Sequence, residues 1–269
     1  MTFVWGHGRL AIQRRTMKAM EHPARIPLAA PAAPDLGRPL EPPASLEPPA
    51  SLEPAAVPDL GRSAEPPATP RYTDVMFGYC GVLIDWRPRR TIEGLYPAGV
   101  VDMFFDPADS HGVAYYDDLA DLGWSEERII ADYEREHGPA VAWIMRLYFE
   151  FQRLGFYDMI DGMPTLMRDL HARGVRLWGL TNFTVRGVRE MHGKYPWLNL
   201  LGGTVISAQE GVAKPDPRIY DIAIGRFHLD PAQTLFVDDN ACNVLAARAA
   251  GLQAVRFESA AQIHALTLD

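Results

Sequence analysis

Short apolar runs alternate with segments of helical periodicity from Tyr72 onward, and this alternation constrains the fold more than any other feature. The apolar runs predict buried strands at 75–77, 175–180, 204–206, 234–237 and 254–257, and the periodic segments predict helices at 163–173, 184–194, 217–227 and 240–250. Strands and helices in alternation predict an α/β fold, a Rossmann-like parallel sheet with helices on both faces. Because ligands of such sheets bind beyond the carboxyl ends of the strands, we expect the functional residues there.

Residues 89–161 interrupt this alternation after the first strand. The stretch is rich in Tyr, Trp and Phe and has helical periodicity, and Ser125 stands where a good helix N-cap is needed. We therefore predict an inserted helical cap at 89–161 and an α/β core made of 71–88 and 162–269. Most of the aromatic rings are expected to form the core of the insert rather than to contact a substrate.

The first 70 residues differ in composition, because they hold 14 of the 23 prolines. Glu-Pro-Pro-Ala-Ser-Leu occurs at 41–46 and again at 47–52, and Pro-Asp-Leu-Gly-Arg occurs at 34–38 and at 58–62. This repeat is too short for a solenoid unit and too rich in proline for a helix. We therefore predict a disordered Pro/Ala/Glu-rich leader over 1–70. Two alternatives stay open: a docking segment for a proline-recognising protein partner, which no spacing or flanking charge supports, and a misassigned translation start.

Charge and cysteine content exclude several classes of function. The net charge of −8 falls wholly on 71–269, because residues 1–70 contain seven basic and seven acidic side chains. An acidic domain repels phosphate backbones, so we predict no nucleic-acid partner. Two cysteines, Cys80 and Cys242, are too few for a disulfide scaffold, and no membrane-spanning or secretory apolar run is visible. We therefore predict a cytoplasmic location and no membrane association.

Polar side chains follow several of the predicted strands at their carboxyl ends. Thr181 and Asn182 follow one strand, Lys214 lies in the loop after another, and Asp238 and Asp239 end a third. A hydroxyl, an amide and an ammonium suit a phosphate group, and carboxylate oxygens suit magnesium. This set predicts a site for a phosphorylated small molecule. Taken singly, each residue also has a structural explanation, since Asp239 or Asn240 can cap the next helix and Lys214 can be an ordinary loop charge.

Four motifs in this order resemble the haloacid dehalogenase superfamily, in particular its phosphatase-like branch with a helical cap after the first strand. They are Gly-Val-Leu-Ile-Asp-Trp at 81–86, Leu-Thr-Asn at 180–182, Lys-Pro-Asp-Pro-Arg-Ile-Tyr at 214–220 and Phe-Val-Asp-Asp-Asn at 236–240. The similarity extends from about Tyr72 to Phe257. It implies catalysis by an aspartate at the end of the first strand, which attacks phosphorus or carbon and forms a covalent intermediate.

The resemblance also assigns roles to this chain's own residues. Thr181 would hold a phosphate oxygen together with Asn182, Lys214 would neutralise developing charge, and Asp238 with Asp239 beside it would hold Mg²⁺. At the nucleophile position, however, this chain has Gly78, and at the position of the general acid/base it has Cys80. A glycine can neither attack a substrate nor ligate a metal, so the implied Mg²⁺ site is weakened as well.

We therefore predict a hydrolase-like protein that is catalytically impaired or a pseudoenzyme. Asp74 and Asp85 are carboxylates near Gly78 in the sequence, but both are too distant to replace the nucleophile. A cysteine-dependent phosphatase is a poor match, because Arg87 comes seven rather than six positions after Cys80. The alternatives that remain are an active phosphomonoester hydrolase and, less favoured because it needs the same carboxylate, a 2-haloacid dehalogenase. The substrate and the oligomeric state do not follow from the sequence.

Overall fold

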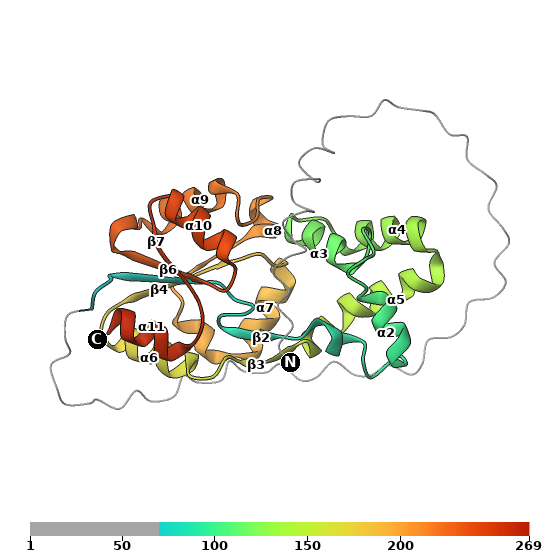
Figure 1. Cartoon of the computed structure of the whole chain (residues 1–269), viewed down its shortest axis with the longest axis horizontal. Coiled ribbons are helices and arrows are strands. Elements are labelled where there is room, and N and C mark those ends of the chain that lie inside the picture. Colours follow the sequence, from blue (N-terminus) through green and yellow to red (C-terminus); the bar gives the residue numbers. More distant parts are fainter. Residues whose placement is uncertain (1–69, 269) are drawn as a thin grey trace, which may run out of the picture. The chain divides into compact units, whose positions relative to one another are not determined.

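The computed structural model describes residues 70–268 and contains a five-stranded parallel sheet (Figure 1). The strand order is β5-β4-β1-β6-β7. The strands are β1 (Asp74–Phe77), β4 (Arg176–Thr181), β5 (Thr204–Ile206), β6 (Thr234–Asp238) and β7 (Gln253–Arg256). Each of the five predicted strands is present to within about one residue, because buried parallel strands read as continuous apolar runs. The predicted α/β fold with a parallel sheet is confirmed.

Helices cover both faces of this sheet (Figure 1). They are α6 (Met163–Ala172), α7 (Val185–Lys194), the short α8 (Ser207–Glu210), α9 (Pro217–Phe227), α10 (Ala241–Ala249) and α11 (Ala260–Thr267), with short 3₁₀ turns η3 (Pro196–Leu200) and η4 (Pro231–Gln233). Side chains of β1 alternate between the faces: Val75 and Phe77 join the apolar cluster under α6 and α11, whereas Met76 joins the cluster under α9 and α10. The four helices predicted in this region are all present.

The helix boundaries follow from local chemistry. The side chain of Thr184 accepts a hydrogen bond from the Gly187 amide at the start of α7, and that of Asn240 accepts one from the Cys242 amide at the start of α10. Of the two residues that could cap this helix from the sequence, Asp239 and Asn240, it is Asn240 that does so. Gly174 and Gly251 follow α6 and α10 with φ angles of 80° and 91°, in the left-handed region that glycine adopts without strain.

The residues between β1 and α6 form a helical segment on a two-stranded stem. The stem pairs β2 (Ile84–Trp86) with β3 (Phe156–Met159) in antiparallel fashion. Between them lie η1 (Pro88–Thr91), α2 (Ala98–Phe104), α3 (Val113–Asp121), α4 (Glu126–His137), α5 (Pro139–Glu150) and η2 (Gln152–Leu154). Ser125 caps α4 as predicted. We refer to residues 88–154 as the inserted segment.

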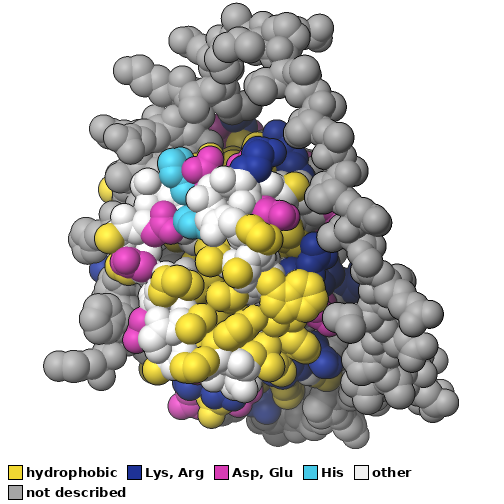
Figure 2. Space-filling model, turned by 90° about the vertical axis from the view of Figure 1, so that its right-hand side faces the viewer, with side chains coloured by type: hydrophobic (Ala, Val, Ile, Leu, Met, Phe, Trp, Pro, Cys, Tyr) yellow, Lys and Arg dark blue, Asp and Glu magenta, His cyan; other side chains and the backbone are white. Residues whose placement is uncertain are grey.

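The inserted segment has an apolar core of its own, to which Tyr116, Tyr133 and Tyr148 each contribute a ring that is at most 1% exposed. Trp86 packs against both this cluster and the one under α6 and α11. Figure 2 shows a face of the molecule on which hydrophobic side chains gather. Among the large exposed hydrophobic side chains of this segment are Leu95, Met103 and Trp143. The aromatic residues thus pack mainly against one another, as expected.

Within residues 70–268 no helix is both long enough and apolar enough to cross a membrane. The predicted leader over 1–70 and its alternative as a docking segment lie outside the described residues, apart from Pro70. Those two interpretations therefore stay predictions.

Candidate active site

The carboxyl ends of β1, β4 and β6 bring the predicted site residues together. Phe77 at the end of β1 is in register with Gly179 of β4 and with Val237 of β6. The amide of the next residue, Gly78, donates a hydrogen bond of 2.8 Å to the Val237 carbonyl. Thr181 and Asp238 end the two flanking strands, so the three strand ends meet at one edge of the sheet.

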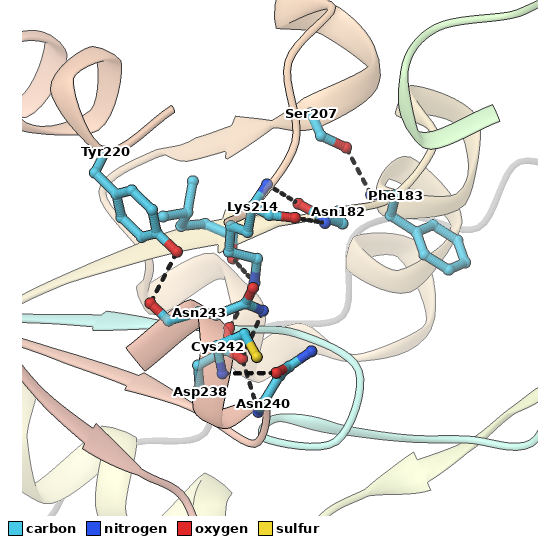
Figure 3. A network of polar contacts seen from close by, with 10 residues as sticks. Asn182, Phe183, Ser207, Lys214, Tyr220, Asp238, Asn240, Cys242 and Asn243 are labelled. Carbon is cyan, nitrogen blue, oxygen red and sulfur yellow. Dashed lines mark hydrogen bonds and ion pairs between the residues drawn. The ribbon is translucent and has the colours of Figure 1, made fainter. Parts of the chain in front are cut away.

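Lys214 and Asp238 form a buried ion pair at this edge (Figure 3). The Lys214 Nζ lies 2.6 Å from Asp238 Oδ2 and donates to the Leu180 carbonyl at 2.9 Å. Lys214 is 5% exposed and Asp238 is 1% exposed. The other carboxylate oxygen, Oδ1, accepts from the Asn240 amide at 3.0 Å and from Asn243 Nδ2 at 2.9 Å. Both oxygens of Asp238 are therefore hydrogen-bonded, which a buried charge needs.

Asn243 is part of the site that the sequence analysis did not identify. It lies in the first turn of α10, five residues after Asp238, so the helix that Asn240 caps turns its amide back to the carboxylate. The Asn243 carbonyl in turn accepts from the Tyr220 hydroxyl at 2.9 Å. Burial, with a further contribution from the Asp238 charge, raises the pKa of Tyr220 above its usual range, so this hydroxyl stays a donor. The Asp-Asp-Asn-x-x-Asn spacing is the signal that could have found Asn243.

Asn182 holds the Lys214 loop in place. Its Nδ2 donates to the Lys214 carbonyl and its Oδ1 accepts from the Lys214 amide, both at 2.9 Å. Sequence analysis assigned this amide to phosphate, whereas the structure places it on the main chain of Lys214. The next residue, Phe183, is held by a contact that the sequence did not suggest. Its amide donates a hydrogen bond of 3.1 Å to the Ser207 hydroxyl. Thr181 is 2% exposed, at the end of β4 beside this loop.

Gly78 stands directly against the ion pair. A Cβ atom built on this glycine would lie 3.0 Å from Asp238 Oδ2 and 3.4 Å from the Val82 side chain. The φ angle of Gly78 is outside the left-handed region, whereas that of Gly81 is 84°. The backbone at 78 therefore accepts an L-residue, and a side chain there would point at the Asp238 carboxylate.

The other candidates near Gly78 have different surroundings. Asp74 is completely buried at the opposite end of β1, where it accepts from Arg176 Nη2 and from Trp178 Nε1, each at 2.8 Å. Asp85 is paired with Arg87 at 2.6 Å. Cys80 is partly buried and pairs with Ile84 in an isolated β-bridge. The structure therefore brings neither carboxylate to the β1 strand end.

The carboxylates at this edge can be compared with what Mg²⁺ requires. Mg²⁺ prefers an octahedral shell of oxygen ligands and is usually bound by one or two carboxylates together with substrate phosphate. Here Asp238 is engaged by Lys214 and two amide donors, and Asp239 is exposed beside Gly81. Among residues 70–268 no three His, Cys, Asp or Glu side chains are placed to hold a metal ion together. The donor set does not fit a magnesium ion held by protein carboxylates.

A family model described as haloacid dehalogenase-like hydrolase matches residues 84–251, which is more than half of the chain. The chain belongs to the haloacid dehalogenase-like hydrolases. The matched segment includes the Thr181, Lys214 and Asp238 strand ends and begins after Gly78. Membership in the family is thus shown by the part of the chain that carries the ion pair, and the matched segment does not cover the glycine.

Curated proteins with sequence similarity to this chain include a phosphatase and a flavin mononucleotide hydrolase. The chain is 39% identical over 93 residues to the sesquiterpene phosphatase astK of Aspergillus oryzae, a match that covers 34% of this chain and 46% of that protein. It is 30% identical over 104 residues to flavin mononucleotide hydrolase 1 of Arabidopsis thaliana, covering 39% of this chain and 42% of the hydrolase. The chain thus spans less than half the length of these relatives.

Solved structures of haloacid dehalogenase-like proteins share the fold. An enzyme of Bacteroides thetaiotaomicron in complex with magnesium and inorganic phosphate aligns with a TM-score of 0.56 at 16% identity, over 70% of this chain and 95% of that one. The L-2-haloacid dehalogenase of Xanthobacter autotrophicus aligns with a TM-score of 0.51 at 15% identity, over 74% of this chain and 89% of that one. At these identities the likeness establishes the fold.

Proposed function

We propose that this haloacid dehalogenase-like protein binds a phosphorylated small molecule at the β1, β4 and β6 strand ends and hydrolyses it weakly or not at all. Phosphomonoesters are the favoured ligand class, because two similar proteins are named as a sesquiterpene phosphatase and a flavin mononucleotide hydrolase. The inserted segment would act as the cap over this site, within the predicted boundaries of 89–161. A cytoplasmic location of the protein stays part of this proposal, whereas a protein partner of the proline-rich leader stays an alternative that no observation supports.

The observation that carries the proposal is the glycine at the end of β1. Gly78 directs no side chain toward the Lys214–Asp238 pair, and the nearby acids Asp74 and Asp85 are paired elsewhere. Removal of a nucleophile costs on the order of 10⁵–10⁶ in rate, or about 7–8 kcal/mol of transition-state stabilisation. Neither the ion pair nor the hydroxyl of Thr181 replaces that contribution, because neither forms a bond to phosphorus.

The remaining residues retain the means to bind an anion. Lys214 brings a buried positive charge to the strand ends, and Thr181 brings a hydroxyl. Asp238 holds the ammonium of Lys214 in position, and Asn182 holds its main chain. Cys80 at the acid/base position has no carboxylate with which to protonate a leaving group. In this proposal Mg²⁺ binding is weakened. Asp238 is paired with Lys214, and Asp239 is the other carboxylate at this edge of the sheet.

The proposal is tested by measuring phosphate release from a generic aryl phosphate by the unmodified protein, with and without magnesium. We expect no turnover above background. Lys214→Ala and Asp238→Ala are the controls that separate activity at this site from a contaminating phosphatase. Robust turnover in the unmodified protein that both variants abolish would refute the proposal and favour the alternative of an active phosphomonoester hydrolase.

A further inference from the structure

We infer that the strand-end site of Gly78, Thr181 and Lys214 binds a phosphate anion without a divalent cation. This inference rests on the proposed function in one respect, namely that the strand ends bind phosphorylated ligands. It goes further, because it assigns the positive charge for anion binding to the ammonium of Lys214 alone. Three features of the site support it: its charge, the partners of Asp238 and the absence of a side chain at Gly78.

The charge at the strand ends favours metal-free binding. The buried charges are the Lys214 ammonium and the Asp238 carboxylate, which compensate each other at 2.6 Å. Asp239 and Arg256, whose Nε donates to the Asp239 carbonyl at 3.1 Å, are both exposed, so solvent and salt screen these two charges. An aspartate at position 78 would add a second carboxylate in contact with Asp238, and a single ammonium would then face two acids. A cation would be needed in that case to admit a phosphate dianion, whereas with glycine the buried part is already neutral.

The partners of Asp238 also reduce its value as a metal ligand. Its Oδ1 accepts from two amide donors, Asn240 N and Asn243 Nδ2, and its Oδ2 accepts from Lys214. Magnesium would have to compete with these donors for a carboxylate that is 1% exposed. In the described part of the chain, no group of three acidic, histidine or cysteine side chains could make up for that competition.

Because residue 78 is a glycine, no side chain from this position covers the Lys214–Asp238 ion pair. The nearest atoms to the Cβ position of Gly78 belong to Asp238 and Val82, at 3.0–3.5 Å. A ligand oxygen that approaches from this side meets the ion pair where a nucleophilic carboxylate would otherwise stand. The Lys214 ammonium is fixed there by the Leu180 carbonyl and by Asp238, so little rearrangement is required on binding.

The test is a calorimetric titration of the full chain with inorganic phosphate, once in the presence of a chelator and once with saturating magnesium. We expect the Kd for phosphate to differ by less than about twofold between the two conditions. Gly78→Asp is the matched variant: magnesium should tighten its phosphate binding by at least about tenfold, and magnesium alone should raise its Tm. Lys214→Gln should abolish binding by the unmodified site, whereas Lys194→Gln, which removes a lysine elsewhere, should retain it.

Lys214→Gln leaves the buried Asp238 carboxylate without its cation, which destabilises the fold. The double variant Lys214→Gln/Asp238→Asn therefore provides a second measurement of the same loss. Phosphate binding that requires magnesium in the unmodified protein, or a rise in its Tm with magnesium alone, would overturn the inference. Absence of phosphate binding in both conditions would overturn it as well. Magnesium-dependent binding would overturn the inference alone, whereas absence of binding in both conditions would also overturn the ligand binding that the proposed function includes, so the two failures are distinguishable.

Discussion

At the scale of single residues, the account depends on the contact between position 78 and Asp238. The Cβ direction of Gly78 meets Asp238 Oδ2 at 3.0 Å, a distance shorter than most Cβ contacts. A side chain at 78 therefore requires the carboxylate to move by a few tenths of an ångström, and an acidic side chain adds like-charge repulsion to this displacement.

Gly78→Asp is accordingly expected to lower the Tm of the metal-free protein. The repulsion and the close contact should together cost about 1–3 kcal/mol, and magnesium should restore much of the loss. The measurement is thermal unfolding of Gly78→Asp and of the neutral, nearly isosteric Gly78→Asn, each with and without magnesium. Equal destabilisation of the two variants would show that the close contact, rather than charge, is responsible.

The Lys214–Asp238 pair gives a second prediction. Lys214→Met leaves the Asp238 carboxylate buried without its cation, so we expect a loss of about 3–5 kcal/mol in the free energy of unfolding. Lys214→Met/Asp238→Asn should recover most of that loss, because the asparagine keeps an oxygen acceptor for Asn240 and Asn243. A double-mutant cycle by urea unfolding measures the coupling. Additive losses in the two single variants would contradict the pairing.

Part of the site could be predicted from single residues and part could not. Thr181 and Asp238 were predictable because each ends an apolar run that reads as a buried strand, and Lys214 was predictable from its place in the Lys-Pro-Asp-Pro motif. The role of Asn182 depends on which loop folds back on it, and the sequence pattern carries no signal for that contact, whereas the Asp-Asp-Asn-x-x-Asn spacing was a signal for Asn243 that the prediction did not use. Asn182 in particular is a main-chain anchor in the structure although its amide suited phosphate equally well.

At the scale of secondary-structure elements, Tyr79 connects the loop after β1 to α7 and β5. Its hydroxyl lies 2.9 Å from His192 Nε2 and 2.7 Å from Thr204 Oγ1. Burial lowers the pKa of His192, and burial raises the pKa of Tyr79. The neutral imidazole is therefore the form that the folded protein favours at this junction.

This arrangement predicts a pH dependence of stability. Since the folded pKa of His192 lies below its ordinary value of 6.5, the unfolded chain binds the proton more tightly, and stability should fall as the pH drops through 6.5. His192→Gln keeps a hydrogen-bonding side chain and removes the titration, so its stability should fall less over the same range. Urea unfolding on both sides of about pH 6.5 gives the comparison. An identical pH dependence in the two proteins would contradict this role of His192.

The sequence predicted neither the short strands β2 and β3 nor the helices α8 and α11. β2 has three residues and β3 has four, and their antiparallel pairing joins segments that the whole inserted segment separates. No period-2 pattern can be recognised in so few residues. Short strands such as β2 and β3 form because of the strand with which they pair. In contrast, β1, β4 and β6 are buried on both faces, and their sequences are therefore continuous apolar runs.

At the scale of the whole molecule, the described residues have separate apolar cores. The cluster of the inserted segment is made of residues between Ile92 and Phe149, and the two clusters at the sheet contain none of them. The ends of the segment are adjacent, because the Arg87 amide donates to the Gly155 carbonyl at 2.8 Å. Ion pairing between Glu126 of α4 and Arg186 of α7, at 2.9 Å, links the segment to the helices at the sheet.

We therefore expect the α/β part to fold after replacement of residues 88–154 by a short glycine-serine linker. The shortened protein should unfold cooperatively in urea, with lower stability because Trp86 and Arg186 lose their partners from the segment. It should also retain phosphate binding, since the strand ends lie outside the segment. Loss of a cooperative transition would show that the cores depend on each other.

The central claim, that one absent carboxylate prevents hydrolysis, is tested most directly by comparing phosphate release by Gly78→Asp, Gly78→Asn and the unmodified protein in magnesium. The account predicts that kcat/KM for an aryl phosphate rises by several orders of magnitude in Gly78→Asp, toward the 10⁵–10⁶ typical of a nucleophile, and stays at background in the other two. Equal rates in all three folded proteins would contradict it, as would high turnover by the unmodified protein.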